Sequence, residues 1–317
     1  MFVKKYFSLV KFAHTIFAMP FAMIGYFLGV DVERHLQCRS ALHSTVLDNG
    51  ITLVLCTKCE ANAAERGAGF SWQTLLLVIL CMVFARNAAM GFNRYADRAI
   101  DAKNPRTDKR EIPSGIIKPR AALAFVIVNA VAFVVTCWFL NPLVFYLSPV
   151  ALLVVLGYSL TKKYTSLCHF VLGAGLSLAP IGAYLAVTGV FDWLPLMFSF
   201  VVLLWVGGFD IIYALQDEDF DLRHRLYSIP AWIGVRRALV VSAVVHIVAG
   251  ALVIAIGIFW NFGIWYTTGA VIFLFLLIYQ HLIVKPDDIS RANAAFFTSN
   301  GIASVVFSVF VVLDLIW

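Results

Sequence analysis

The sequence has few charged residues for its size. Asp, Glu, Lys and Arg make up 13% of its 317 residues, whereas hydrophobic residues make up 62%. Soluble globular domains carry roughly 25% charged and about 45–50% apolar residues. A water-soluble fold could not hide this much apolar surface and cover the remainder with so few charges. The composition therefore excludes a soluble enzyme, a disordered tail and a collagen-like rod, and it places the chain in a lipid bilayer.

The sequence also lacks the features of a disulfide framework and of a cleaved signal peptide. Cysteine behaves as a small hydrophobe in apolar runs, and such runs contain or adjoin Cys81, Cys137 and Cys168. The apolar stretch 12–30 is too long for the core of a signal peptide, and no small-residue cleavage site follows it. We therefore interpret this stretch as part of the first membrane span.

Long apolar runs recur along the whole chain, without the polar–apolar alternation of a β-barrel. A helix needs about 20 apolar residues to cross the hydrocarbon core. With that window the sequence predicts one all-α membrane domain over residues 1–317, with nine transmembrane helices at 8–30, 73–92, 121–140, 142–160, 167–189, 194–214, 237–258, 262–284 and 295–316. Residues 31–72 form a long outer insertion between the first two helices.

Basic residues gather on one side of the predicted bundle. With the amino terminus inside, all but four of the 24 Lys and Arg residues fall in inner segments or at inner helix ends. Because short cytoplasmic loops are enriched in Lys and Arg, we expect a bacterial inner-membrane protein with its amino terminus in the cytoplasm and its carboxyl terminus outside. The net charge of +6 therefore reflects topology, and we expect no nucleic-acid partner.

The outer insertion contains a cysteine pair that invites a zinc site. Cys56 and Cys59 form a CxxC pair, with Cys38, His35 and His43 upstream. The spacing between these residues is irregular, and CxxC alone is common. The pattern favours a disulfide or an irregular insertion over a metal site.

Two inner segments hold acidic residues at a repeated spacing. The first contains Asn93, Asp97 and Asp101, and the second contains Asp210, Tyr213, Asp217 and Asp221. Residues four apart share one helix face, about 6 Å apart along the axis. We expect the carboxylates to form stripes at the inner ends of the second and sixth spans, where they repel unless a cation lies between them. Oxygen ligands without nearby His or Cys suit Mg²⁺.

The two motifs are related by a constant offset in the sequence. Three pairs of residues are each 124 positions apart: Asn93 and Asp217, Asp97 and Asp221, and Arg86 and Asp210. This offset is typical of a parallel internal repeat. We expect two parallel four-helix repeats plus a ninth helix, with the motifs facing one another. An ionisable residue within a span needs a partner, and we hypothesise that Arg86 pairs with Asp210.

These motifs resemble those of the UbiA-type intramembrane prenyltransferase superfamily, and the resemblance covers nearly the whole chain. Residues 86–101 are similar to its first aspartate-rich motif and residues 210–221 to its second. An arginine-rich turn and a Tyr/Lys pair also match, at Arg106, Arg110 and Pro113 and at Tyr158 and Lys162. The match is closest to the bacterial 4-hydroxybenzoate polyprenyltransferase-like subgroup. Asp219-Phe220-Asp221 and the long insertion depart from the usual pattern.

The resemblance implies a reaction and a set of site residues. It implies Mg²⁺-dependent transfer of a polyprenyl group from a polyprenyl diphosphate to an aromatic acceptor, 4-hydroxybenzoate or a related precursor of ubiquinone or menaquinone. The metal ligands would be Asp97, Asp101, Asp217 and Asp221. The diphosphate would be bound by Arg86, Arg110, Tyr158, Lys162 and Arg223. Catalytic roles would also fall to Asn93, Asp210 and Tyr213, although Tyr213 could equally be a core residue.

Two alternatives remain open at this stage. The acceptor could be another ring, such as a futalosine-type menaquinone precursor, homogentisate, haem or chlorophyllide. A membrane transporter also has repeats and intramembrane charges, but it needs polar residues along a path across the membrane. Here the acidic residues crowd at one face, which disfavours a transport path.

Overall fold

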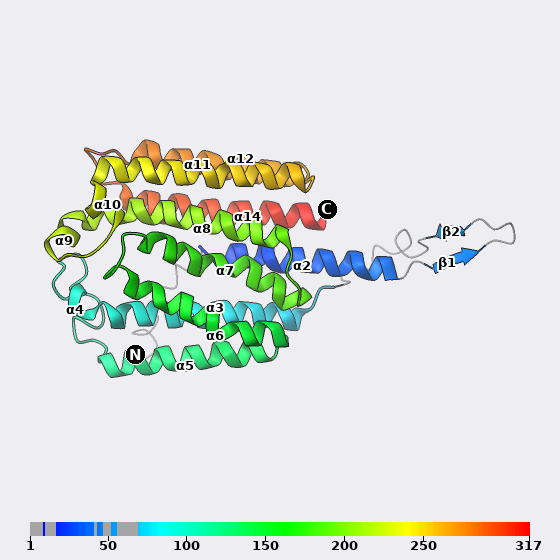
Figure 1. Ribbon diagram of the computed structural model, residues 1–317, viewed down its shortest axis with the longest axis horizontal. Helices are drawn as coiled ribbons and strands as arrows, with labels where there is room; N and C mark the ends of the chain where they lie inside the picture. Colours follow the sequence, from blue (N-terminus) through cyan, green and yellow to red (C-terminus); the bar gives the residue numbers. More distant parts are fainter. Residues whose placement is uncertain (1–8, 10–16, 41–42, 47–51, 56–68) are drawn as a thin grey trace.

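A computed structural model shows long helices that run side by side along one axis (Figure 1). It describes residue 9 and residues 17–40, 43–46, 52–55 and 69–317. The long helices are α2 (Met19–Ser40), α3 (Trp72–Ala96), α5 (Pro119–Trp138), α6 (Pro142–Thr161), α7 (Cys168–Thr188), α8 (Trp193–Ala214), α11 (Val235–Phe259), α12 (Ile264–Ile283) and α14 (Asn300–Ile316). The predicted helical membrane architecture is confirmed in outline.

Several helices begin where polar side chains satisfy the first backbone N–H groups. The side chains of Ser71, Asn141 and Asp192 accept hydrogen bonds from the first turns of α3, α6 and α8. Pro119 and Pro142 occupy the first turns of α5 and α6, where a backbone donor is not needed. In hydrocarbon every other backbone group must be bonded within its own segment. The apolar runs therefore fold as uninterrupted helices, and the breaks fall at their ends.

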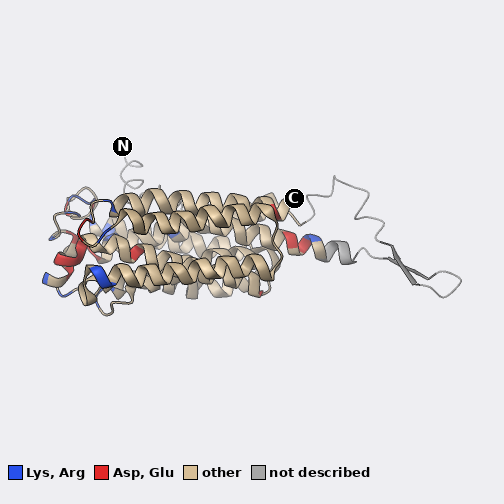
Figure 2. Ribbon diagram, turned by 90° about the horizontal axis from the view of Figure 1, so that it is seen from above, with Lys and Arg blue, Asp and Glu red and all other residues tan. Residues whose placement is uncertain are grey.

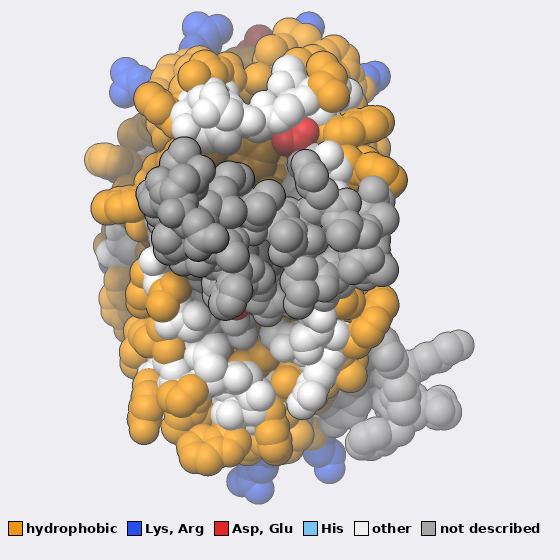
Figure 3. Space-filling model, turned by 90° about the vertical axis from the view of Figure 1, so that its right-hand side faces the viewer, with side chains coloured by type: hydrophobic (Ala, Val, Ile, Leu, Met, Phe, Trp, Pro, Cys, Tyr) orange, Lys and Arg blue, Asp and Glu red, His pale blue; other side chains and the backbone are white. Residues whose placement is uncertain are grey.

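Short elements lie at the two ends of the bundle. One end carries α4 (Arg98–Asp101), the 3-10 turn η3 (Leu215–Asp217), α9 (Glu218–Arg223), α10 (Ile229–Ile233) and α13 (Ala292–Ala294). The other end carries an antiparallel hairpin of β1 (His43–Val46) and β2 (Thr52–Leu55). Lys, Arg, Asp and Glu residues concentrate at the first end (Figure 2), which we call the charged end. Seen from the opposite end, the described surface is mainly hydrophobic (Figure 3).

The first helix differs from its prediction. The expected span 8–30 corresponds to α2, which begins at Met19 and continues to Ser40. Residues 31–40 are therefore helical, so the outer connection begins later than expected. Asp31, Glu33 and Arg34 lie in this extension. A helix can continue into water beyond its apolar part, so these charged residues do not end α2. Residues 8 and 10–16 of the expected span, like Cys56 and Cys59, lie outside the described residues.

The count of nine spans is not confirmed. Within the described part of the chain, eight helices are long and apolar enough to cross a membrane, and α2 is not among them. The last of these eight begins in α13 and includes η4 (Ala295–Ser299), a single turn of π-helix, before α14. The predicted repeat stays a prediction, although its equivalent helices pack alike: α3 packs on α5, and α8 on α11.

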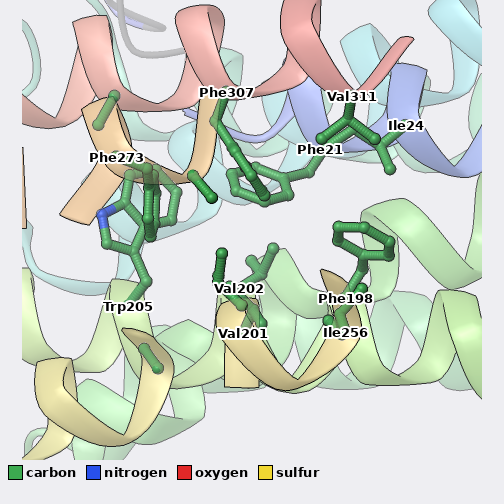
Figure 4. Packing of buried hydrophobic residues seen from close by; sticks show 14 of the residues in the cluster. Phe21, Ile24, Phe198, Val201, Val202, Trp205, Ile256, Phe273, Phe307 and Val311 are labelled. Carbon is green, nitrogen blue, oxygen red and sulfur yellow. The ribbon is translucent and has the colours of Figure 1, made fainter. Parts of the chain in front are cut away.

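The core centres on α8, the helix that leads into the second acidic motif. Fully buried Trp205 contacts the rings of Phe21 on α2 and Phe273 on α12, and Phe307 on α14 packs against both phenylalanines (Figure 4). Lipid tails are as apolar as these side chains, so van der Waals packing rather than removal from water holds the helices together, and close packing fixes the rotation of each helix. The core therefore holds α8 rigidly at the charged end.

Candidate active site

Both acidic motifs lie at the charged end, and both contain a break in the helix. The α3 helix ends at Ala96, and Asp97 is the residue between α3 and α4. The α8 helix ends at Ala214, and the chain passes through η3 before α9. In the first motif the backbone N–H groups of Asp97 and Asp101 still bond to the carbonyls four residues earlier, so the expected shared face is kept there. In the second motif the 3-10 turn η3 interrupts the α-helix before Asp217, so the expected single straight stripe is wrong for Asp210, Asp217 and Asp221.

The first motif is neutralised from its own side of the bundle. Asn93 Nδ2 donates to Asp97 Oδ2 at 3.1 Å. Arg110 Nη1 lies 2.7 Å from Oδ1 of Asp101, whose side chain is buried. The second carboxylate oxygen of Asp101, Oδ2, is buried without a hydrogen-bond partner. Asp101 can therefore accept one more cation or donor.

The second motif is reached by the loop that follows the first. Arg106 Nε donates to Asp217 Oδ1 at 2.9 Å, and Arg106 Nη2 donates to Asp217 Oδ2. Asn104 Nδ2 donates to the same Oδ1 at 3.1 Å. Arg–carboxylate pairs with two parallel bonds are both strong and geometrically specific. The prediction that the two motifs meet at one end of the bundle is therefore supported by direct contacts.

Lys162, at the end of α6, connects the two motifs electrostatically. Its Nζ lies 2.8 Å from Oδ1 of Asp221, a fully buried residue, and its charge also acts on Asp97 and Asp217. Burial lowers the pKa of Lys162, but the charge of Asp221 and the hydrogen bond to it outweigh burial, and the net pKa is raised. Lys162 is therefore a fixed cation between the motifs.

Asp97 remains incompletely neutralised despite these cations. Burial raises the pKa of its carboxyl to about 6, and the charge of Asp101 adds to this effect. Lys163, Lys162 and Arg110 oppose the increase, but they do not cancel it. Burial, more than charge repulsion, therefore penalises the ionised form of Asp97, and a cation bound beside the carboxylate would offset that penalty.

An apolar cavity of about 340 Å³ lies between α3, α5, α6 and α7. Its wall carries few polar side chains; the ionisable ones are Arg86, Tyr158, Cys81 and Cys137. Arg86 Nε is buried without a hydrogen-bond partner. A buried cation without an anionic partner is costly. Arg86 therefore offers a binding group for an anion where the cavity approaches the charged end.

The hypothesised pair of Arg86 and Asp210 is wrong. Oδ2 of Asp210 lies 2.7 Å from Nδ1 of His169 on α7, and no ion pair of Arg86 is found in the described part of the chain. The offset of 124 residues sets an equivalent depth in two helices. It does not set which face of each helix points to which neighbour, and that rotation decides the pair.

Tyr213 lies in the site and in an aromatic cluster at once. Arg106 Nη1 donates to its hydroxyl at 2.9 Å, and the guanidinium carbon lies 5.2 Å from its ring centre. The ring of Phe296, on the π-helical turn η4, lies 4.1 Å from it, and Phe297 lies 6.1 Å away. Phe17 and Phe209 complete the cluster. The two predicted roles of Tyr213, as a residue of the active site and as a core residue, are therefore compatible.

Not every expected residue joins this group. The side chain of Arg223 is exposed and makes no ion pair with the residues that the structure describes. The sequence motifs did not predict that Asn104 and Arg106 bond to Asp217, or that His169 bonds to Asp210. The arginine-rich turn around Arg106 was a visible signal in the sequence, but the spacing did not assign it to Asp217. Nothing in the pattern indicated His169.

The donor set fits Mg²⁺ bound together with a substrate. Among the described residues, no three His, Cys, Asp or Glu side chains converge on one point, so the protein alone forms no closed metal cage. Mg²⁺ usually takes one or two carboxylates and completes its shell with water and substrate phosphates. The oxygen-only donors of the motifs and the unpartnered Oδ2 of Asp101 suit such an open site.

Several known proteins have sequences related to this one. Residues 54–301 match the UbiA prenyltransferase family. A 4-hydroxybenzoate octaprenyltransferase of Vibrio parahaemolyticus is 30% identical over 239 residues, covering 74% of this chain and 83% of that protein. A protein of the same name from Nitrosospira multiformis is 31% identical over 235 residues, covering 74% and 80%.

Solved structures agree on the fold. A UbiA homologue from Aeropyrum pernix K1 is 27% identical, with a TM-score of 0.71 over 96% of this chain and 97% of that one. A UbiA homologue from Archaeoglobus fulgidus bound to DMAPP and Mg²⁺ is 16% identical, with a TM-score of 0.67 over 98% and 99%. This chain is therefore an integral membrane prenyltransferase that belongs to the UbiA prenyltransferase family.

Proposed function

We propose that the protein transfers a polyprenyl group from a polyprenyl diphosphate to 4-hydroxybenzoate or a closely related aromatic precursor of a membrane quinone. The names of its relatives support the acceptor class. One observation carries the proposal: contacts join the two acidic motifs at the charged end of the bundle, and an apolar cavity lined by Arg86, whose Nε has no hydrogen-bond partner, lies between the helices α3, α5, α6 and α7. A substrate with a diphosphate head and a hydrocarbon tail has this division of charge.

The diphosphate head would be held at the charged end. We assign Mg²⁺ binding to Asp97, Asp101, Asp217 and Asp221, with Asn93 orienting Asp97. When bound, the ion would neutralise charge that develops on the leaving oxygen. Arg86, Arg110 and Lys162 would supply fixed cations to the same phosphates, with the Tyr158 hydroxyl as a neutral donor. Arg223 is exposed, and nothing in its contacts supports a role at the diphosphate.

The isoprenoid tail would enter the cavity between α3, α5, α6 and α7. Its lining is almost wholly aliphatic and aromatic, with Met82, Phe133 and Leu176 among the wall residues. Apolar walls also exclude water from the allylic carbon. Exclusion matters because water would compete with the acceptor for the same carbon.

The transfer breaks one C–O bond and forms one C–C bond. The diphosphate leaves with the bonding electron pair, and the allylic carbon becomes cationic. An electron-rich carbon of the acceptor ring supplies the electrons of the new bond and then loses its proton. Tyr213 and Phe297, the two partly exposed members of the aromatic cluster, are suited to this stage, since ring faces attract cations and stack on aromatic acceptors.

We place the site on the cytoplasmic face of the bacterial inner membrane. The basic residues gather at the same end as the acidic motifs, and cytoplasmic loops are the ones enriched in Lys and Arg. This assignment puts the amino terminus inside and the carboxyl terminus outside. Labelling of single introduced cysteines from either side of sealed vesicles checks the assignment.

The activity is tested with the full-length protein in detergent. A radiolabelled polyprenyl diphosphate, Mg²⁺ and either 4-hydroxybenzoate or homogentisate are supplied, and labelled lipophilic product is counted. We expect product with 4-hydroxybenzoate and none after EDTA treatment until Mg²⁺ is restored. The Asp217→Asn variant should lose turnover, whereas Asp287→Asn, which changes an exposed carboxylate after α12, should retain it.

The alternatives give different results in the same assay. Product with homogentisate alone would assign another ring and overturn the proposed acceptor. Absence of product with any acceptor, together with solute uptake by proteoliposomes, would replace the transferase proposal by transport. Full activity of Asp217→Asn would remove the metal assignment.

A further inference from the structure

A buried histidine outside the proposed metal and diphosphate ligands connects to the loop behind the second motif. His169, at the start of α7, is 2% exposed. Both of its ring nitrogens have partners: Nδ1 lies 2.7 Å from Asp210 Oδ2, and the backbone N–H of Ile229 donates to Nε2 at 3.3 Å. Because Nε2 accepts, Nδ1 carries the proton and donates to Asp210. Asp210 therefore orients the ring.

The loop that His169 contacts follows directly after the second motif. Residues 224–228 connect α9, which contains Asp221, to α10, which begins at Ile229. The loop includes Arg225 with φ of 53°, a conformation that is uncommon for a residue with a side chain. Such a backbone persists only where surrounding contacts hold it.

Several hydrogen bonds hold this loop against the site, and three of them are made by its backbone N–H groups. The Leu226 N–H donates to Asp221 O at 2.9 Å, and the Tyr227 N–H donates to Lys162 O at 2.8 Å. The third is the Ile229 N–H donation to His169. The loop is thus joined to both members of the Asp221–Lys162 ion pair.

Two further contacts of the loop involve side chains: the Cys168 thiol donates to Tyr227 O at 3.5 Å, and the Ser228 side chain hydrogen-bonds to Asp221. Among the three N–H donations, that of Ile229 is the one accepted by a side chain outside the loop, His169.

We propose that His169, oriented by Asp210, is a positioning residue for the metal–diphosphate site. It holds the loop 224–229 so that Asp221 and Lys162 stay 2.8 Å apart. Residues that orient metal ligands commonly change metal affinity or activity about 10- to 100-fold when they are removed. The inference rests on the proposed function for its effect on catalysis, whereas the contact itself is testable without substrate.

Three substitutions separate positioning from simple loss of a buried side chain. Gln places its amide close to where Nε2 lies, so His169→Gln can still accept from Ile229. Asn reaches only as far as Nδ1, so His169→Asn keeps the bond to Asp210 and loses the bond to Ile229. Ala loses both. We expect the His169→Gln variant to behave much like the unmodified protein, and we expect both His169→Asn and His169→Ala to be impaired.

The first measurement is hydrogen–deuterium exchange in detergent without substrate. Amides of residues 226–229 should exchange faster in His169→Asn and His169→Ala than in His169→Gln. His224→Gln serves as the matched control, since His224 is an exposed histidine of the same loop and its ring contacts only α9. Unchanged exchange in the Ala variant would overturn the proposed contact, whatever reaction the protein catalyses.

The second measurement is the kinetic response. In the Asn and Ala variants we expect the half-saturating Mg²⁺ concentration and the KM for the polyprenyl diphosphate to rise about tenfold or more, with the KM for the aromatic acceptor unchanged. Faster exchange without this change would show a structural role only and reject positioning. Impaired kinetics in His169→Gln together with normal kinetics in His169→Asn would also reject the positioning role. Absence of turnover in the unmodified protein would instead contradict the proposed function.

Discussion

The ion pair between Arg106 and Asp217 gives the sharpest quantitative prediction. Replacing Arg106 by Leu removes both hydrogen bonds to Asp217 and the one to the Tyr213 hydroxyl. The Asp217 carboxylate then keeps only the Asn104 bond of 3.1 Å. The side chain of Asp217 is 10% exposed and that of Arg106 is 31% exposed. The substitution therefore leaves a largely buried anion with little compensation.

The expected loss of stability follows from these contacts. Removing one partner of a fully buried pair costs about 3–5 kcal/mol, whereas a hydrogen bond to a charged group contributes about 1.5–3 kcal/mol. Water reaches part of Arg106 and screens the pair, so we expect a loss of about 2 kcal/mol. At about 2–4 °C per kcal/mol, the apparent melting temperature should fall by about 4–8 °C.

Added Mg²⁺ should act in the opposite direction on the variant. Without Arg106, the Asp217 carboxylate has no bidentate cationic partner and is available to the metal. A ligand that binds the folded state more tightly stabilises it more. The gap between the two melting temperatures should therefore narrow at millimolar Mg²⁺, because the ion replaces part of the lost charge.

The assay is thermal unfolding in detergent, with and without Mg²⁺, followed by intrinsic fluorescence. Arg120→Leu is the control, since Arg120 is an exposed arginine at the start of α5 without an ion pair in the described part of the chain. Equal melting temperatures for Arg106→Leu and the unmodified protein would refute the stabilising role of the pair. An identical Mg²⁺ response in both would refute the competition between Arg106 and the metal for the Asp217 carboxylate.

Three further predictions concern the cavity and the first motif. Arg86→Met should raise the KM for the polyprenyl diphosphate about tenfold or more through loss of one charge-assisted contact. Thermal stability should be maintained, because Arg86 Nε has no hydrogen-bond partner within the described part of the protein. The half-saturating Mg²⁺ concentration should rise as the pH falls through about 6, because protons then compete with the metal for Asp97. Burial and the charge of Asp101 raise the pKa of Asp97 to about 6. The Asp97→Asn variant should lose this pH dependence. Gly182→Phe should disfavour long polyprenyl diphosphates over geranyl diphosphate, because Gly182 lines the cavity and a Cβ placed there has no neighbour within 4 Å. Gly157→Phe should leave the preference unchanged, since a Cβ at Gly157 also has no neighbour within 4 Å but Gly157 does not line the cavity.

The helices and the position of the site were predictable because both depend on local properties of the chain. Apolar runs of helix-spanning length gave helices close to the predicted spans, from α3 onward. The acidic motifs follow α3 and α8 at equivalent depths, so their meeting at one end follows from helix direction and length. The first helix was misjudged, since its charged part at Asp31 and Glu33 remains helical outside the apolar run.

Partners across the bundle were not predictable in this way. Asp210 bonds to His169 and not to Arg86, and Asp217 bonds to Arg106 from a loop. Each contact depends on how helices rotate about their axes and on where a loop folds back. These choices are made by packing between segments distant in sequence, such as the contact of Trp205 with Phe21 and Phe273.

The sequence by itself determined that this protein folds in lipid, where most of its helices begin and end, and at which end of the helices its carboxylates lie. Hydropathy and helical periodicity act along each segment, and neither requires knowledge of a neighbour. Only the tertiary structure decided which groups face one another: the arginine that binds Asp217, the histidine that holds the loop behind Asp221, and the arginine left without a partner at the cavity. Rotation about a helix axis is set by the side chains packed against it, and those come from elsewhere in the chain.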